Sequence, residues 1–276
     1  MLFQSTAGSI ISEDVLRAAL DRVRAADCRI LYIHTGMHFG APNPELGRTG
    51  LLTRLWDILR GLGVPTLLFP TFTFSFCNGQ DFDVAQSRSR MGALNEYVRK
   101  LPDTIRSLDP LMSSVVTGPD RDLVEATGRH SIGEDCTFDR LHRRGRDVKF
   151  LFFGTTASDC FTYTHYVEEC LGSPYRYRRE FTGNITSGGR TWHDTYILFV
   201  RYHGVVPATS GKLEADLIRR GHLRKVACGD SSISALAEPD GYSTIVEHLT
   251  ADPYAYIARD PRDRDTLFEV RDMVAL

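Results

Sequence analysis

The pattern of apolar and polar positions predicts helices that alternate with short buried strands. Apolar residues recur at helical spacing in several segments, and the first of these begins with a capping serine, Ser12. Short and almost wholly apolar runs lie between them and predict buried strands. The expected helices are residues 12–26, 49–61, 91–101, 137–145, 158–171, 211–222, 241–250 and 252–258, and the expected strands are residues 29–34, 65–69, 148–153, 175–182 and 191–203.

The order of these elements favours an α/β fold. A strand, a loop, a helix and a second strand follow one another over residues 29–69, which is typical of a parallel α/β layer. We therefore expect a mixed, largely parallel sheet flanked by helices. No repeat or Pro/Gly/Ser-rich linker divides the chain, so residues 1–276 are expected to form a single large domain. Residues 70–90 are aromatic, polar and aperiodic, and predict a long functional loop.

Composition narrows the classes of function. The 276 residues include 33 Lys+Arg and 35 Asp+Glu, for a net charge of -2, so there is no overall basic surface for a nucleic-acid backbone. No apolar run reaches the ~18–20 residues of a membrane span, and the first residues lack the pattern of a signal peptide. Six dispersed cysteines without a CxxC pair are typical of free thiols. We expect a cytoplasmic protein with neither a nucleic-acid nor a membrane partner.

The segment FTYTHYVEE, residues 161–169, is the most informative for catalysis. On a helix, Thr162, His165 and Glu168 are three residues apart and share one stripe, which begins just beyond an apolar strand. A glutamate within reach of a histidine can fix its tautomer and make it a general base. An ordinary surface pair is the alternative, although the aromatic neighbours favour partial burial.

A second segment, IHTGMHFG at residues 33–40, ends a strand with small residues. Their N–H groups could hold a phosphate, although this is neither a Walker loop nor a dinucleotide fingerprint. A buried structural role is the alternative for His34. His34 and His38 have the spacing of two metal ligands, but the glycines place them in a loop and no carboxylate partner follows, so we expect no metal.

Two hydroxyl-rich loops, residues 70–76 and 106–114, could also bind a ligand. Arg106 and Ser107 in the second loop could engage a phosphate or a carbonyl oxygen. The sequence GDSS at 229–232 is similar to a fragment of a serine-hydrolase block, but no strand is recognisable before it, so we assign it no catalytic role.

Taken together, these segments resemble the aminoglycoside 3-N-acetyltransferase family, also called the antibiotic acetyltransferases. The resemblance extends from about residue 10 to 258. It differs at Asp109, where many members have histidine, and at Gly36 and His38 in the first turn. The matching blocks, in order, are LYIHTGM, FPTFTFSF, FDVAQSRSRMGAL, RKLPDTIRSLDPLMSS, GEDCTFDRLH, TYTHYVE and PYRYRREFTG.

This resemblance implies a fold of the antibiotic acetyltransferase type and transfer of acetyl from acetyl-CoA to a primary amine of an aminoglycoside or a related amino sugar. The alternatives are an amino-sugar N-acyltransferase of surface-polysaccharide or natural-product biosynthesis, and a non-catalytic CoA-binding protein of the same fold. The oligomeric state is left open, with a homodimer as one option.

The resemblance also implies roles for individual residues. The catalytic set is His165 as general base, Glu168 as its orienting partner, Thr162 and His34, with direct transfer preferred over a covalent route through Cys160. The predicted CoA-binding residues are His34, Thr35, Gly36, Thr71, Thr73, Arg106, Ser107 and Ser113. The acceptor is expected to be a cation in an acidic pocket, and the predicted substrate-binding residues are Asp81, Asp83, Glu169 and Tyr175, together with Glu168.

Overall fold

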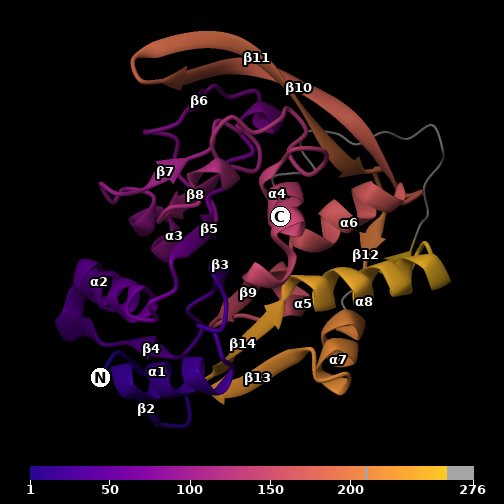
Figure 1. Cartoon of the computed structure of the whole chain (residues 1–276). Coiled ribbons are helices and arrows are strands. Elements are labelled where there is room, and N and C mark those ends of the chain that lie inside the picture. The colour runs from indigo at the N-terminus through magenta and orange to yellow at the C-terminus, as the bar shows by residue number, and fades with distance from the viewer. Residues whose placement is uncertain (209–210, 260–276) are drawn as a thin grey trace.

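A mixed seven-stranded sheet forms the centre of the protein, in the order β13-β14-β9-β3-β5-β8-β7 (Figure 1). The structure is a computed structural model that describes residues 1–208 and 211–259, so the end of the predicted 1–276 domain lies outside the described residues. The strands are β3 (Ile30–Thr35), β5 (Thr66–Pro70), β7 (Ile105–Arg106), β8 (Ser114–Thr117), β9 (Val148–Phe153), β13 (Leu223–Cys228) and β14 (Ser231–Ala237).

The α/β class is confirmed, but the sheet is less parallel than predicted. Only the three central strands, β9, β3 and β5, run parallel to one another. The strands on either side pair antiparallel. The difference arises at the edges, because β13 and β14 form a hairpin around GDSS that carries too many polar residues to show as a strand pattern. The expectation that no strand precedes GDSS is therefore wrong.

The central strands bury both faces, which explains their continuous apolar sequences. Alternate residues of β3 enter opposite cores: Ile30 and Tyr32 pack on one face of the sheet, and Leu31 and Ile33 on the other. The second core also contains side chains of α1 (Glu13–Arg22), α2 (Gly47–Arg60) and α3 (Ala93–Val98). The first contains side chains of α4 (Thr137–Arg144), α6 (Tyr163–Leu171), α7 (Lys212–Arg219) and α8 (Glu238–Ala251).

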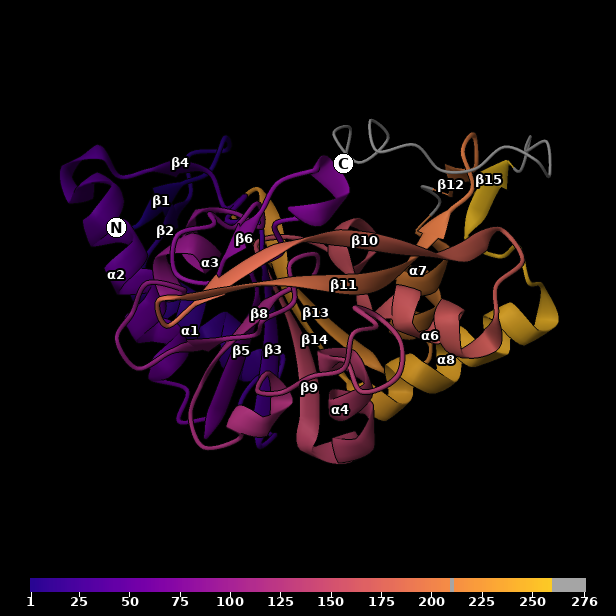
Figure 2. The same ribbon diagram turned by 90° about the horizontal axis from the view of Figure 1, so that it is seen from above.

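A long antiparallel hairpin of β10 (Arg176–Ser187) and β11 (Arg190–Arg201) spans the molecule from β6 (Phe82–Asp83) to α6 (Figure 2). The pairing of these two segments is confirmed. Its two-residue turn is Gly188–Gly189, and both residues have positive φ, which suits a two-residue hairpin turn. This turn places Arg176 directly opposite Arg201 at the other end of the hairpin.

The remaining elements are short. The strands are β1 (Phe3–Gln4), β2 (Ile10–Ile11), β4 (Ala41–Pro42), β12 (Val206–Pro207) and β15 (Ile257–Arg259), and the 3₁₀ turns are Pro44–Leu46, Phe76–Asn78, Arg121–Leu123 and Gly145–Asp147. Within the described ranges, no helix is long and apolar enough to cross a membrane.

Most predicted helices are confirmed, with two exceptions. The helix expected at 158–171 is divided into α5 (Ala157–Cys160) and α6. The helix expected at 252–258 is wrong, because this segment forms a turn and the start of β15 instead. The loop expected at 70–90 is largely irregular and buries Phe72, Phe76 and Phe82 against the first core.

Candidate active site

A cavity of about 310 Å³ lies beyond the carboxyl end of β9, where ligands of α/β sheets commonly bind. Its walls come from five parts of the chain: the α5–α6 segment, the start of β10, the end of β11, residues 207, 208 and 211–213, and residues 256–257. The polar side chains on its walls that matter most are His165, Glu168, Arg176, Arg201, Lys212 and Tyr256.

His165 and Glu168 are in direct contact, as their helical spacing predicts. The His165 Nδ1 atom lies 2.7 Å from Glu168 Oε2. The His165 side chain is 42% exposed, whereas that of Glu168 is 3% exposed. A half-exposed imidazole is thus held from behind by a buried carboxylate, with its other ring edge available to a ligand.

Arg176 is a third member of this group. Its Nε lies 2.8 Å from Glu168 Oε2, and its Nη2 lies 2.8 Å from His165 Nδ1. Tyr175 completes the group by donating its hydroxyl to Glu168 Oε1 at 2.5 Å. Glu168 therefore makes contacts with three side chains that fix its orientation.

These contacts determine the charge of the pair. Burial works against ionisation of Glu168, but the charge of Arg176 and the hydrogen bonds from His165 and Tyr175 hold its pKa at about 2. The pKa of His165 lies below its ordinary value, because burial and the charge of Arg176 outweigh Glu168. Near neutral pH the site contains a neutral imidazole beside an ionised carboxylate.

Other residues of the predicted catalytic set differ in their access to this cavity. Thr162 lines it, and its hydroxyl donates to the carbonyl of Cys160 at 3.2 Å. Cys160 also lines it, but burial raises the pKa of its thiol to about 12. The thiolate needed for covalent catalysis is therefore scarce at neutral pH.

His34 does not join this group. Its ring is 3% exposed and stacks on Phe152, with the ring centroids 5.4 Å apart. Burial lowers its pKa to about 3, and its Nε2 has no hydrogen-bond partner among the described residues. The catalytic role predicted for His34 is corrected, because the ring is packed in the core and is not among the residues that line the cavity.

Tyr256 belongs to the wall of the cavity although sequence reasoning assigned it no role. Its hydroxyl lies 3.1 Å from His248 Nδ1, and His248 Nε2 lies 2.9 Å from Asp216 Oδ2. This chain of contacts attaches the segment after α8 to α7. It also explains why the residues expected to form a helix at 252–258 take an irregular path along the cavity.

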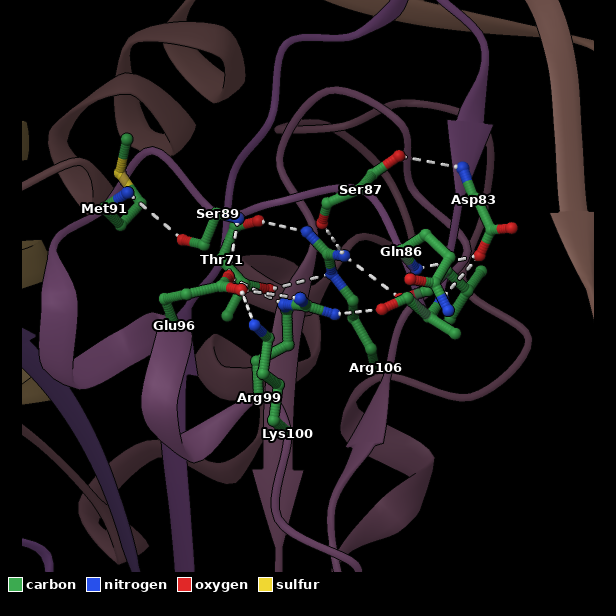
Figure 3. A network of polar contacts seen from close by, with 12 residues as sticks. Thr71, Asp83, Gln86, Ser87, Ser89, Met91, Glu96, Arg99, Lys100 and Arg106 are labelled. Atoms are coloured by element: carbon green, nitrogen blue, oxygen red, sulfur yellow. Dashed lines mark hydrogen bonds and ion pairs between the residues drawn. The ribbon is translucent and has the colours of Figure 1, made fainter. Parts of the chain in front are cut away.

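The predicted CoA-binding residue Arg106 is committed to the fold. Its Nη1 donates to the carbonyl oxygens of Val84 and Ser87, and its Nη2 donates to the carbonyl of Thr71 at 2.7 Å (Figure 3). Its Nε donates to the hydroxyl of Ser113 at 3.1 Å. The guanidinium thus fastens the 84–87 loop to β7, and a phosphate could reach it only by displacing these bonds.

Its hydroxyl-bearing neighbours are similarly enclosed. Thr71, Ser107 and Ser113 are almost completely buried. Thr71 donates to the carbonyl of Ser113 at 3.1 Å, and Ser107 accepts from the N–H of Ser114 at 3.1 Å. The prediction that Arg106, Thr71, Ser107 and Ser113 line a CoA channel is therefore corrected: sequence alone does not distinguish a hydroxyl that satisfies a buried backbone from one that faces a ligand.

The turn of Thr35 and Gly36 lies close to Gly92 and Asn95. Thr35 is partly exposed and donates to Asn95 Oδ1 at 2.5 Å. A Cβ added to Gly92 would lie 3.8 Å from the Thr35 hydroxyl. Gly36 has no room for a side chain, since a Cβ there would come within 2.5 Å of the Gly154 carbonyl oxygen.

Two further cavities share the same two arginines, Arg88 and Arg90. One, of about 420 Å³, is lined by residues 88–90, 92 and 93. The other, of about 680 Å³, contains the predicted CoA-binding Thr73 and the predicted substrate-binding Asp81 on its walls. Arg88 and Arg90 are exposed, and sequence reasoning did not single them out.

The predicted acidic pocket is not assembled. Asp81 is bonded to Asn184 at the second of these cavities, and Asp83 caps the N–H groups of Ala85 and Gln86. Glu169 is paired with Arg178. Of the predicted carboxylates only Glu168 lines the cavity with His165.

Tyr175 also lines that cavity, but it is fully buried and its ring has no exposed face on which a sugar could stack. The substrate-binding role predicted for Tyr175 is corrected, since its ring is enclosed and its hydroxyl is bonded to Glu168.

Arg176 and Arg201 are the functional candidates that sequence reasoning missed. A signal for them was present, because counting outward from a two-residue Gly188–Gly189 turn pairs Arg176 with Arg201. Groups of three or more His, Cys, Asp or Glu side chains suited to a metal ion do not occur in the part of the chain that the structure describes.

Comparison with known proteins gives a family match. The model of the aminoglycoside 3-N-acetyltransferase family matches residues 50–250. A search of curated proteins returns no significant match.

Solved structures agree on the fold. The chain is similar to the aminoglycoside acetyltransferase AAC(3)-Xa, with 19% identity, a TM-score of 0.71, and coverage of 87% of this chain and 92% of that one. It is similar to AAC-IIIb in a binary complex with CoASH, with 18% identity, a TM-score of 0.72, and coverage of 92% and 100%. It is also similar to sisomicin-bound AAC-VIa, with 19% identity, a TM-score of 0.71, and coverage of 88% and 99%.

Proposed function

The chain belongs to the aminoglycoside 3-N-acetyltransferase family, and we propose that it transfers an acetyl group from acetyl-CoA to a primary amine of an aminoglycoside or a related amino sugar. The observation that carries this proposal is the His165–Glu168 contact of 2.7 Å on the wall of a cavity beyond the central sheet. Two structural relatives were solved with CoASH and with sisomicin, which are the two kinds of ligand that this reaction requires.

His165 acts as the general base in this proposal. We assign the proton of its neutral ring to Nδ1, where Glu168 Oε2 accepts it, so that the lone pair of Nε2 is free for the acceptor. In this tautomer the approach of Arg176 Nη2 to Nδ1 is not a hydrogen bond, because both groups are donors. Nε2 takes a proton from the amine as the amine nitrogen attacks the thioester carbonyl carbon. The carbon–sulfur bond then breaks, and the imidazolium returns a proton to the departing CoA thiolate.

Direct transfer needs donors for the oxyanion that forms at the thioester carbonyl. Of the threonine hydroxyls Thr71, Thr73 and Thr162, which are candidates for this purpose, only Thr162 lines the cavity with His165. Thr71 and Thr73 are buried and donate to the carbonyls of Ser113 and Pro110. The high pKa of the Cys160 thiol supports direct transfer over an acetyl-cysteine intermediate.

We place the phosphates of CoA at the cavities that Arg88 and Arg90 share. Exposed guanidinium groups bind phosphate oxygens with charge-assisted hydrogen bonds. The predicted turn at Thr35 lies beside Gly92 on the wall of the smaller cavity, and Thr73 lies on the wall of the larger one. Of the residues predicted to bind CoA, we therefore retain Thr35, Gly36 and Thr73 in this proposal.

Substitution of these arginines tests the CoA placement. We expect Arg88→Gln and Arg90→Gln each to raise the KM for acetyl-CoA about 10-fold, since a hydrogen bond to a charged group contributes roughly 1.5–3 kcal/mol. Steady-state kinetics at saturating acceptor measures this. Arg22→Gln, an exposed change in the last turn of α1, is the control. An unchanged KM for acetyl-CoA in both variants would show that CoA binds elsewhere.

The pH dependence of kcat/KM tests the role of His165. Only the neutral ring accepts a proton, so activity falls in acid as the ring becomes protonated. Because the pKa of His165 is held below its ordinary value of 6.5, we expect the midpoint of this acid limb to lie below pH 6.5. A profile with no acid limb, or with its midpoint above 6.5, would contradict the assignment.

The reaction itself is tested by thiol release from acetyl-CoA with a panel of aminoglycosides and amino sugars, with mass spectrometry of the product. We expect a mass gain of one acetyl group on a primary amine. Binding of acetyl-CoA without turnover on any amine would instead support a non-catalytic CoA-binding protein.

A further inference from the structure

The cavity that holds His165 also contains an arginine that has no direct ion-pair partner among the described residues. Arg201 ends β11 and lines the cavity. None of the residues within 1–208 and 211–259 forms a hydrogen bond or an ion pair with its guanidinium. Arg201 is only partly exposed, so bulk water does not fully surround this charge.

The position of Arg201 in the hairpin adds a second positive charge next to its own. It lies directly opposite Arg176 in the antiparallel ladder of β10 and β11. Directly opposed side chains of two strands have Cβ atoms roughly 4.5–5.5 Å apart, and like charges in such pairs destabilise the sheet. A pair of arginines at this point is therefore unfavourable unless negative charge balances both.

The described residues place one carboxylate, Glu168, near both arginines; it contacts Arg176 directly and acts on Arg201 only through its charge. Glu168 is the carboxylate on this side of the cavity, and its two oxygens are already bonded to His165, Arg176 and Tyr175. Asp159, on the rim, is exposed and accepts from the hydroxyl of Thr156. Lys212 adds a further positive charge to the cavity wall.

We propose that Arg201 binds an acidic group, a phosphate or a carboxylate, carried by the amine acceptor. The inference rests on the proposed acetyl transfer and narrows its acceptor to an amino sugar, or a similar small amine, that carries an acid group. A polycationic aminoglycoside would place further positive charge beside Arg201 and Lys212, which costs free energy in a partly enclosed cavity.

The acceptor is a better source of this acid group than CoA. The base that deprotonates the acceptor, His165, lies in the same cavity and is in contact with Arg176, the cross-strand neighbour of Arg201. In acetyl-CoA the phosphates are separated from the reacting thioester by the whole pantetheine arm. An anion site beside the base thus fits a group close to the reacting amine.

Three related sugars test this proposal: glucosamine, glucosamine 6-phosphate and muramic acid, of which the last two add a phosphate or a carboxylate. We expect the wild type to have a higher kcat/KM for at least one acidic sugar than for glucosamine. In Arg201→Gln this preference should fall about 10- to 100-fold, mainly through the KM of the acidic sugar, because a charge-assisted hydrogen bond is lost.

Arg201→Lys should recover part of the preference, since it restores the charge without the planar fork. Arg60→Gln, at the exposed end of α2 on the opposite face of the sheet, is the matched control.

Other outcomes would overturn the proposal in distinct ways. A larger rise in the KM for acetyl-CoA than for the acidic sugar would assign Arg201 to the phosphates of CoA. A fall in kcat alone, equal for all three sugars, would assign it to the thioester oxyanion. Equal kcat/KM for the three sugars in the wild type would remove the acid-binding role.

Calorimetry with glucosamine 6-phosphate and muramic acid separates this proposal from the proposed function. Binding that is weakened in Arg201→Gln, without acetylation of any amine, would support the anion site and refute the acetyl transfer. Acetylation of neutral amines together with no Arg201-dependent binding of either acidic sugar would support the transfer and refute the anion site.

Discussion

Replacing His165 with alanine is expected to lower turnover by about 10²–10⁴-fold, the usual contribution of a general acid–base residue. The ring is the only histidine side chain among those that line the described cavity, and Glu168 holds its Nδ1 edge. Without it, the amine must lose its proton to water before it attacks the thioester. Single-turnover kinetics with acetyl-CoA and a competent amine measure the loss.

Two comparisons separate a chemical role of His165 from a structural one. The affinity of His165→Ala for acetyl-CoA, measured by calorimetry, should stay near that of the wild type, because the imidazole acts on the acceptor. His34→Ala provides a contrast: removal of a core ring stacked on Phe152 should lower the free energy of unfolding. Near-normal turnover in a folded His165→Ala variant would remove this residue from the mechanism.

Replacing Glu168 with glutamine is expected to lower the free energy of unfolding by about 3–5 kcal/mol, as when one partner of a buried ion pair is removed. The Arg176 side chain is 7% exposed and would lose the carboxylate that lies 2.8 Å from its Nε. Urea unfolding of the wild type and the variant at neutral pH gives the difference. Activity should fall as well, because the imidazole loses the acceptor that orients it.

The neighbouring position supplies a matched control. Glu169→Gln removes the same charge one residue later, but Glu169 pairs with Arg178, whose side chain is 63% exposed. Water can solvate Arg178 once it is unpaired, so this loss should be about 1 kcal/mol or less. Adding Arg176→Met to Glu168→Gln should restore part of the stability, since no unpaired buried charge remains. A double variant no more stable than Glu168→Gln would contradict this explanation.

The stabilising effect of Glu168 should also depend on pH. Its pKa in the folded protein is about 2, below its ordinary value of 4.5. The carboxylate therefore stabilises the fold fully above pH 4.5, and this contribution is lost as pH falls towards 2. The difference in unfolding free energy between the wild type and Glu168→Gln should shrink over the same interval.

The sequence by itself determined the elements that are governed by local pattern. The runs at 29–34, 65–69 and 148–153 are apolar on both faces, and only a strand covered on both sides accommodates such a run. The contact between His165 and Glu168 was predictable for a related reason, because a spacing of three residues on a helix brings two side chains together. The ordered sequence motifs were also sufficient to identify the family, since the family model matches residues 50–250.

Tertiary structure decided which polar residues face a ligand and which satisfy the interior. Arg106 and Arg201 are both arginines near a strand end, yet Arg106 donates to four residues of the fold, whereas Arg201 lines a cavity without a hydrogen-bond partner in the described chain. Nothing in their local sequence separates them, because the groups that surround each come from distant segments. The same holds for the acidic pocket, which was expected because the acceptor is a cation and which is not assembled around His165, where the fold opposes Arg176 and Arg201. A side chain's charge is local, but its burial and its partners depend on contacts between segments far apart in sequence, and these exist only once the chain has folded.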